Sequence, residues 1–402
     1  MLRLKNLDAP SRRLIFGTTV LAMSILSVPV FIAFTRTGQS DEMWRRKGVF
    51  TYRSEVVCID RRDIVRTYNG YSSTDFNLRT GSFVKTASLK TLRRESSSLS
   101  PDGMTIVSVE PVMSTRTQIV IRNAVNLSVI RRVNLPVQSK NQFSSVHHVS
   151  SQYVVVSQWG EKEYVKGTCA VLDEPSKRVL SFPAADKYGY MAMFFQKGKD
   201  EYLGSVDGKN IQLYSPTSVN KRLDIDALDQ PTDQRPVYGY FFPTAFVHPQ
   251  GNRLFASVQF AKSLRGGEHE TGSVYAWDLN TGKVVWRWQD TDVQPVALSL
   301  SPNGKLLAVG GTVYFPSTYE RGARLLILDA TTGQVKQEFF RSRGGSGSWQ
   351  QALEKVRRTP DRLYPSGYDV PTVTGISWTV DSASIVAAYA DDEIIRWRVR
   401  SH

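Results

Sequence analysis

Short apolar runs, bounded by turns rich in glycine and proline, recur along most of this chain. The clearest example lies between residues 273 and 340. Residues 273–279 and 284–288 predict two strands joined by a turn at Asn280 to Lys283, and residues 323–329 and 335–340 repeat that arrangement. Between the two copies lie a shorter run, the turn Ser301-Pro302-Asn303-Gly304, and another run. Turns this tight make neighbouring strands antiparallel, so each unit predicts a small antiparallel sheet.

The repeat extends over most of the chain. Its second hairpin turn aligns near Gly81, Asn126, Pro175, Pro216, Gly282 and Gly333, at intervals of 41 to 66 residues. Residues 48–402 therefore predict an all-β fold, a seven-bladed β-propeller, with six or eight blades as alternatives. The last unit lacks a fourth strand, and we expect Val49 to Tyr52 to supply it and close the ring.

Two families share features with these units. Trp277-Asp278 and the turn at Ser301 to Gly304 resemble the WD-repeat family, whereas residues 276–286 are also similar to the repeat of quinoprotein (PQQ) propellers. Both resemblances imply a propeller. The second would also imply PQQ, a calcium ion and often an adjacent cysteine pair, but no Cys-Cys occurs in the chain, so we assign no cofactor.

The N-terminus predicts a membrane segment. A basic tail, residues 1–13, precedes the uncharged run 14–34, which as a helix is about 31 Å long and matches a bilayer core. We expect a single-pass transmembrane signal anchor, followed by a linker at residues 35–47, with the propeller outside the cytoplasm, periplasmic or at the cell surface. A cleaved signal peptide and a twin-arginine signal at Arg12-Arg13 are the alternatives.

The composition of the chain suggests an anionic binding partner. The chain has 402 residues and a formal net charge of +14, which suits lipid headgroups, an envelope polymer or nucleic acid. The charge is spread along the chain, which is more typical of solubilising surface, so nucleic acid is the weakest of these partners. Cys58 and Cys169 fall in different units, and we expect two buried free thiols.

The longer connections predict where binding occurs. In a propeller, the connections from one sheet's outermost strand to the next sheet's innermost strand lie on the same face as those between the second and third strands. The long segments of this chain all belong to these two kinds of connection. They include an inserted loop at residues 341–371, with a short helix expected near residues 349–358. Aromatic and arginine side chains, which are typical of interfaces, gather in these segments. The candidate partner-binding residues are Phe260, Tyr314, Phe315, Tyr319, Arg321, Arg343, Trp349, Arg357, Arg358, Arg362, Tyr364 and Tyr368.

Recognisable catalytic motifs are absent from the sequence. No HExxH, GxSxG, P-loop or CxxC spacing occurs, His147-His148 are adjacent in an expected strand, and Asp391-Asp392-Glu393 is interpreted as a solvated turn. We therefore name no catalytic or metal-binding residue. The leading hypothesis is a membrane-anchored propeller that binds a protein or peptide. A quinoprotein-like dehydrogenase or propeller hydrolase with a central-channel site, and an envelope component that binds anionic polymer, remain open.

Overall fold

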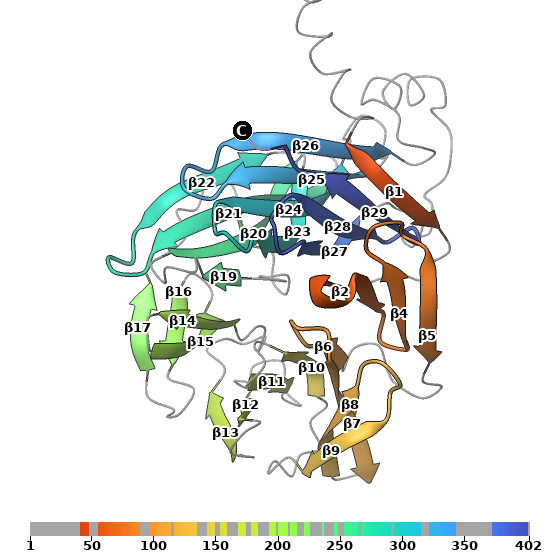
Figure 1. Cartoon of the computed structure of the whole chain (residues 1–402). Coiled ribbons are helices and arrows are strands. Elements are labelled where there is room, and N and C mark those ends of the chain that lie inside the picture. Colours follow the sequence, from red (N-terminus) through yellow and green to blue (C-terminus); the bar gives the residue numbers. More distant parts are fainter. Residues whose placement is uncertain are drawn as a thin grey trace, which may run out of the picture.

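The computed structural model describes residues 41–47, 55–88, 97–113, 116–134, 143–148, 153–158, 168–173, 178–183, 193–197, 200–207, 210–214, 221–225, 235–236, 245–247, 253–264, 267–290, 293–314, 321–342 and 372–400. Within these residues the chain is all-β, and a single 3-10 turn, Asp60–Arg62, is the one helical element. The strands form seven antiparallel sheets around a common centre (Figure 1). This arrangement confirms the all-β, propeller-like prediction.

Six of the sheets are built from strands that are consecutive in the chain. The first three are β2 (Glu55–Ile59), β3 (Ile64–Tyr68), β4 (Ser72–Asn77) and β5 (Phe83–Ser88); β6 (Ser97–Leu99), β7 (Thr105–Met113), β8 (Arg116–Asn123) and β9 (Val129–Asn134); and β10 (Phe143–His148), β11 (Tyr153–Gln158), β12 (Thr168–Asp173) and β13 (Arg178–Pro183). The predicted strand around the two adjacent histidines is therefore confirmed as β10.

The next three sheets continue the pattern. They are β14 (Met193–Lys197), β15 (Asp200–Asp207), β16 (Asn210–Tyr214) and β17 (Lys221–Ile225); β18 (Arg235–Pro236), β19 (Ala245–Val247), β20 (Arg253–Leu264), β21 (Gly267–Asp278) and β22 (Val284–Asp290); and β23 (Val293–Leu300), β24 (Leu306–Tyr314), β25 (Arg321–Asp329) and β26 (Val335–Ser342). The innermost strands contact one another across the boundaries between sheets: β6 contacts β10, β14 contacts β19, and β23 contacts both β19 and β27 (Val373–Trp378) of the last sheet.

The seventh sheet joins the two ends of the described chain. It has the order β1 (Glu42–Lys47), β29 (Glu393–Arg398), β28 (Ser384–Tyr389), β27. We call it the closing sheet. Ring closure by an N-terminal strand is thus confirmed, but the prediction of which residues supply it is wrong. Glu42–Lys47, placed in the linker by the sequence analysis, pairs with β29, whereas Val49 to Tyr52 lie outside the described residues.

The prediction of the closing strand failed because the length and β-branched character of a segment do not specify which strand it pairs with. Trp44 has the more specific role, because its indole is buried against the neighbouring sheet and its Nε1 donates a hydrogen bond to the carbonyl oxygen of Leu78 at 2.9 Å. Arg46 also donates to a carbonyl of that sheet, the oxygen of Gly81. Contacts with the next sheet therefore select the closing strand.

The tight turns lie together at one end of the ring. In three sheets the turn before the outermost strand donates a backbone N–H to the turn after the innermost strand, from Leu78 to Asp63, Ala124 to Met104, and Ala330 to Lys305; in the closing sheet Val399, directly after β29, donates to Ala383. We call this the tight-turn end. Its turns form as predicted, with Gly81, Gly103, Gly282, Gly304 and Gly333 at positive φ.

The core consists of apolar layers between adjacent sheets. Leu307, Leu326 and Leu328 pack with Phe255 and Trp286 of the preceding sheet. Similar layers join the β23–β26 sheet to the closing sheet, the closing sheet to the β2–β5 sheet, and that sheet to β6–β9. Because both faces of the β23–β26 sheet are covered, its strand β25 is continuously apolar along Leu325 to Leu328.

One inter-sheet contact occurs twice with the same geometry. Trp286 of β22 donates its Nε1 hydrogen to the oxygen of Ala330 at 3.1 Å and lies over Gly333. Trp44 of β1 makes the corresponding contacts with Leu78 and Gly81. In each case an indole of an outermost strand docks on the glycine turn of the next sheet, where a side chain at the glycine position would collide with the ring.

The N-terminal membrane segment lies outside the described residues. In the part of the chain that the structure describes, no helix has the length and apolar character needed to cross a bilayer.

Candidate functional site

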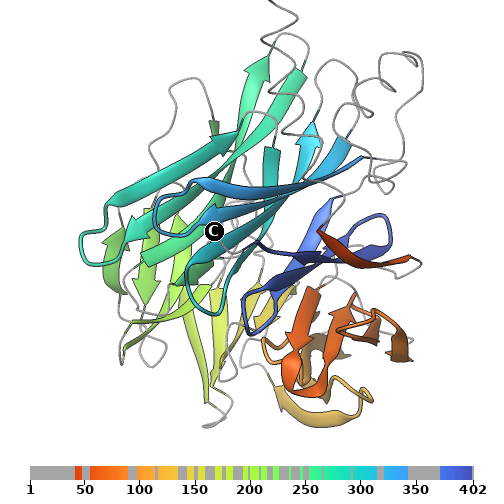
Figure 2. The ribbon, with the colours of Figure 1, turned by 45° about the horizontal axis from the view of Figure 1, so that its top comes forward.

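The end opposite the tight turns carries the longest hairpins. We call it the long-hairpin end. β20 and β21 pair over their full lengths from Arg253–Asp278 to Leu264–Gly267, and β24 and β25 pair as far as Tyr314 and Arg321. Figure 2 shows these strands extending beyond the rest of the ring. Residues 259–272 belong to the long connections predicted from the sequence, but residues 259–264 and 267–272 are paired strand; the register continues because each added residue gains ladder hydrogen bonds.

Three of the predicted partner-binding residues lie in described strands. Tyr314 at the end of β24 faces Arg321 at the start of β25 across the ladder. Phe260 in β20 is paired with Thr271 of β21 and Pro236 of β18. The structure thus brings Tyr314 and Arg321 together at one hairpin and places Phe260 in another sheet.

The other nine candidates lie outside the described residues, and their role stays a prediction. They are Phe315, Tyr319, Arg343, Trp349, Arg357, Arg358, Arg362, Tyr364 and Tyr368.

A buried ion cluster lies at this end between the β23–β26 sheet and the closing sheet. Arg341 near the end of β26 contacts Asp391 at 2.6 Å and Glu393 at 2.7 Å. Glu393 also contacts Arg45 and Lys47 of the closing strand at 3.5 and 3.3 Å. Burial raises the pKa of the Asp391 carboxyl, an effect that Arg341 opposes. The cluster links the closing strand electrostatically to the adjacent sheet.

An aromatic side chain completes this cluster. The Arg341 guanidinium lies 4.9 Å from the ring centroid of Tyr389, and the Tyr389 hydroxyl accepts a hydrogen bond from Trp397 Nε1 at 3.0 Å. Burial raises the pKa of Tyr389 well above its ordinary value, so the phenol stays neutral. Its hydroxyl can therefore act as a hydrogen-bond donor or acceptor but not as a base at neutral pH.

A second ion cluster joins the two preceding sheets. Arg324 of β25 contacts Asp290 at the end of β22 at 2.5 Å and Glu338 of β26 at 2.5 Å. All three side chains are partly exposed, so solvent weakens the attraction relative to the buried cluster. Both clusters hold adjacent sheets in register at the end where the long hairpins begin.

A carboxyl with a displaced pKa lies near the inner edge of this end. Glu55 begins the innermost strand β2, and its Oε2 accepts a hydrogen bond from the backbone N–H of Leu99 at 2.5 Å and one from Ser98 Oγ at 3.3 Å. Burial raises the pKa of Glu55 to about 7, although these hydrogen bonds favour the ionised form. Glu55 is thus a group that changes charge near neutral pH beside the ring centre.

The free thiol of Cys58 lies deeper in the same strand. Its Sγ donates toward the carbonyl oxygen of Ser377 at 3.8 Å, and burial raises its pKa to about 12. A thiol with so little thiolate is a poor nucleophile, which fits the predicted structural role. Among the described residues no group of three His, Cys, Asp or Glu side chains is placed to hold a metal ion.

Sequence reasoning missed the polar residues of these clusters. Asp391-Asp392-Glu393 does form a hairpin turn, but the expectation that it is solvated is wrong for Glu393, which is buried against Arg341. The available signal was a glutamate directly before two buried isoleucines, Glu393-Ile394-Ile395. Its partner, Arg341, is distant in sequence and part of no motif.

Comparisons with known proteins support the fold. No family model matches the chain, and no curated protein matches its sequence. A solved structure, the hydrazine synthase of Kuenenia stuttgartiensis, matches with a TM-score of 0.56 at 15% identity, over 92% of this chain and 99% of that chain. This likeness concerns the propeller-like fold, and the WD-repeat and quinoprotein resemblances stay predictions.

Proposed function

We propose that this chain is a membrane-anchored, seven-bladed β-propeller that binds a protein partner at its long-hairpin end. The observation that carries the proposal is the position of the closing strand. β1 begins at Glu42, only seven residues after the apolar segment ends at Phe34. Seven extended residues span at most about 24 Å, so an anchored segment keeps the ring close to the bilayer.

The direction of β1 supports an orientation. Glu42 lies opposite Trp397, and the oxygen of Asp41 accepts a hydrogen bond from Arg398 N–H, next to the turn that precedes β28. The chain therefore enters the ring at the tight-turn end. An anchor attached there directs the long-hairpin end, with Tyr314 and Arg321, away from the membrane and toward a partner in the aqueous phase.

The polar clusters support a binding role for that end. Arg341 and Arg324 fix adjacent sheets with ion pairs at the base of the long hairpins, and such rigid support reduces the conformational cost of binding through the segments that extend beyond it. We place this domain outside the cytoplasm, periplasmic or at the cell surface, because a lone N-terminal apolar segment ahead of a large domain typically acts as a signal anchor.

Site-specific photo-crosslinking in intact membranes tests the proposal. A photoreactive residue replaces Tyr314 at the long-hairpin end or, as the matched control, exposed Lys305 at the tight-turn end. We expect one protein adduct from position 314 and none from position 305, and loss of that adduct when residues 344–358 are deleted. Extraction of the chain from membranes by alkaline carbonate, or adducts of equal yield at both positions, would contradict the proposal.

A further inference from the structure

The exposed large apolar side chains of the described residues gather at one end of the ring. Nine of the ten lie in a turn of the tight-turn end or within the first two residues of an outermost strand, and Tyr71 is the exception. The nine are Met43, Phe83, Val84, Val129, Ile130, Val284, Val285, Val335 and Val380. Exposed apolar side chains thus recur at this end in five of the seven sheets, unlike the single scattered apolar residues of an ordinary soluble surface.

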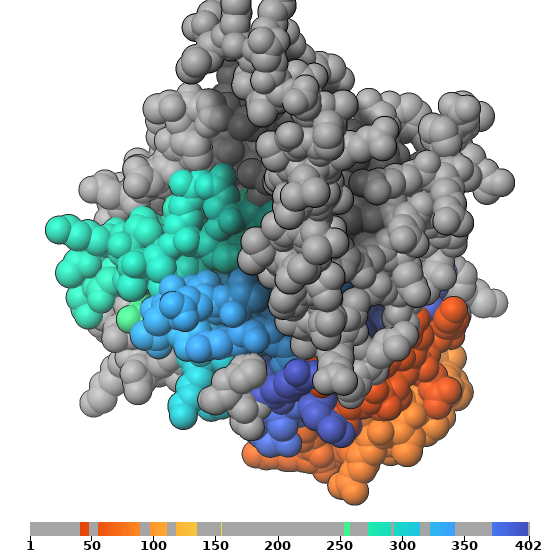
Figure 3. All heavy atoms as spheres, turned by 90° about the horizontal axis from the view of Figure 1, so that it is seen from above, coloured from red at the N-terminus to blue at the C-terminus, as the bar shows by residue number. Residues whose placement is uncertain are grey.

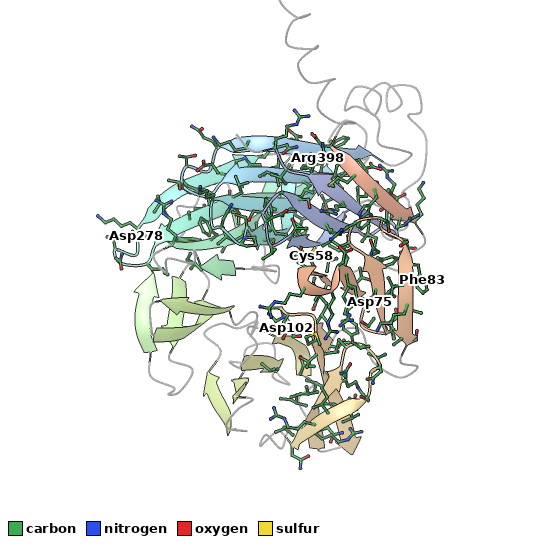
Figure 4. The ribbon with its side chains drawn as sticks, viewed as in Figure 1. Cys58, Asp75, Phe83, Asp102, Asp278 and Arg398 are labelled. Carbon is green, nitrogen blue, oxygen red and sulfur yellow. The ribbon has the colours of Figure 1, made fainter. Side chains whose placement is uncertain are left out.

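The pattern follows from the fold. Every outermost strand runs in the same direction around the ring, so residues that open these strands share the tight-turn end. Phe83 is 61% exposed at the start of β5, and Ile130 is 57% exposed at the start of β9. Figure 4 shows Phe83 on the outer margin of β5, and Figure 3 shows part of the outer surface, where residues of the C-terminal sheets lie beside those of the N-terminal sheets. We call these nine exposed apolar residues the belt.

Basic side chains border this belt. Arg79, Lys283 and Lys305 are exposed in turns of the tight-turn end, and Arg61 and Arg62 are exposed in the turn after β2. An interleaved apolar and basic surface is typical of proteins that lie on a membrane, where apolar groups enter the interface and cations meet anionic headgroups.

Acidic side chains at the same end are largely engaged within the turns. The exposed carboxylates among the described side chains there belong to Asp102 and Asp381. Asp102 accepts hydrogen bonds from Ser100 Oγ and Met104 N–H, and Asp381 accepts from Thr379 Oγ1 and Ala383 N–H. Hydrogen bonds from neutral donors do not cancel a negative charge, and Asp60, Asp63, Asp278 and Asp329 are half-exposed at the same end, so this end presents charges of both signs.

We propose that the tight-turn end of the ring rests on the surface of a bilayer, with Phe83, Ile130 and Val284 at the headgroup boundary. This inference rests on the proposed anchor, because the chain enters the ring at that end through Asp41. The belt contacts lipid rather than a second copy of the chain or a soluble partner, because the short tether between the anchor and β1 brings the belt and its cations to the membrane. The ring then lies flat, with its axis along the bilayer normal.

Depth-dependent quenching in vesicles tests the inference with the full chain. A bimane fluorophore is attached to Ile130→Cys at the belt or, as the control, to Tyr71→Cys at the opposite end, both in a Cys169→Ser background. Vesicles contain phosphatidylcholine with phosphatidylglycerol and a lipid brominated on its acyl chain. We expect strong quenching at position 130 and little at position 71.

A second set of variants distinguishes the membrane contact made by the belt from that made by the anchor. Phe83→Ser combined with Val284→Ser is expected to reduce quenching at position 130 several-fold, whereas Lys47→Ser at the long-hairpin end of β1 leaves it unchanged. Chain that stays with the vesicles in alkaline carbonate but shows equal quenching at positions 130 and 71 overturns the inference and leaves the anchor intact. Chain that is released by carbonate overturns the anchor itself.

Discussion

The docked indole of the closing strand allows a quantitative prediction about ring closure. Trp44→Ala removes a buried ring that covers the Gly81 turn and donates a hydrogen bond to Leu78. An indole takes about 200 Å² out of water, and at about 25 cal/mol per Å² this area corresponds to about 5 kcal/mol. Alanine retains part of that contact, so we expect the free energy of unfolding to fall by about 3–5 kcal/mol.

Two further variants separate the contribution of the buried ring from that of the hydrogen bond. Trp44→Phe keeps an aromatic ring over Gly81 but loses the hydrogen bond to Leu78, and we expect a smaller loss, about 1–2 kcal/mol. Trp286→Ala removes the equivalent indole between two internal sheets, with a loss similar to that of Trp44→Ala. The measurement is urea unfolding followed by far-ultraviolet circular dichroism at constant chain concentration.

Closure adds a consequence that is specific to Trp44. When β1 detaches, the edge of β29 loses its partner and can pair with another chain, so Trp44→Ala is expected to form oligomers in light scattering, whereas Trp286→Ala is not. An unfolding free energy for Trp44→Ala within about 1 kcal/mol of the wild type, without oligomers, would falsify the view that this indole holds the ring shut.

The remaining predictions concern a turn, a carboxyl and a thiol. Gly81→Ala places a Cβ 2.6 Å from the docked indole at a φ of 66°. We expect it to destabilise the fold more than Gly282→Ala, where φ is 70° but no atom lies within 4 Å of the new Cβ. Thermal melting of both variants tests this difference. The raised pKa of Glu55 means that the folded chain binds more protons than the unfolded chain, so stability should fall as pH rises from about 4.5 to about 7, and Glu55→Gln should abolish this slope in urea titrations. Cys58, with a pKa of about 12, should resist maleimide in the native Cys169→Ser variant and react once urea unfolds the chain, as mass spectrometry would register.

Much of the fold could be predicted from interactions within short segments of the chain. Turns such as Ser301 to Gly304 form within the segment itself, because Ser301 Oγ accepts the Leu306 N–H and Gly304 adopts a φ of 71°. The Asp278 turn works in the same way, with its carboxylate accepting N–H groups from Asn280 and Thr281. These interactions join residues at most five apart, so the amino-acid order alone predicts the strands, the repeat and the end at which the tight turns gather.

Only the tertiary structure decided which distant segments meet. The choice of Glu42–Lys47 as closing strand depends on Trp44 fitting the turn at Gly81, and the charge cluster depends on Arg341 reaching Glu393 across a boundary between sheets. Neither contact belongs to a motif, because packing and ion pairing depend on position in space rather than on spacing along the chain. The same reason explains the belt: Phe83 and Val284 are unremarkable strand residues one by one, and only the common direction of the outermost strands places them at one end of the ring.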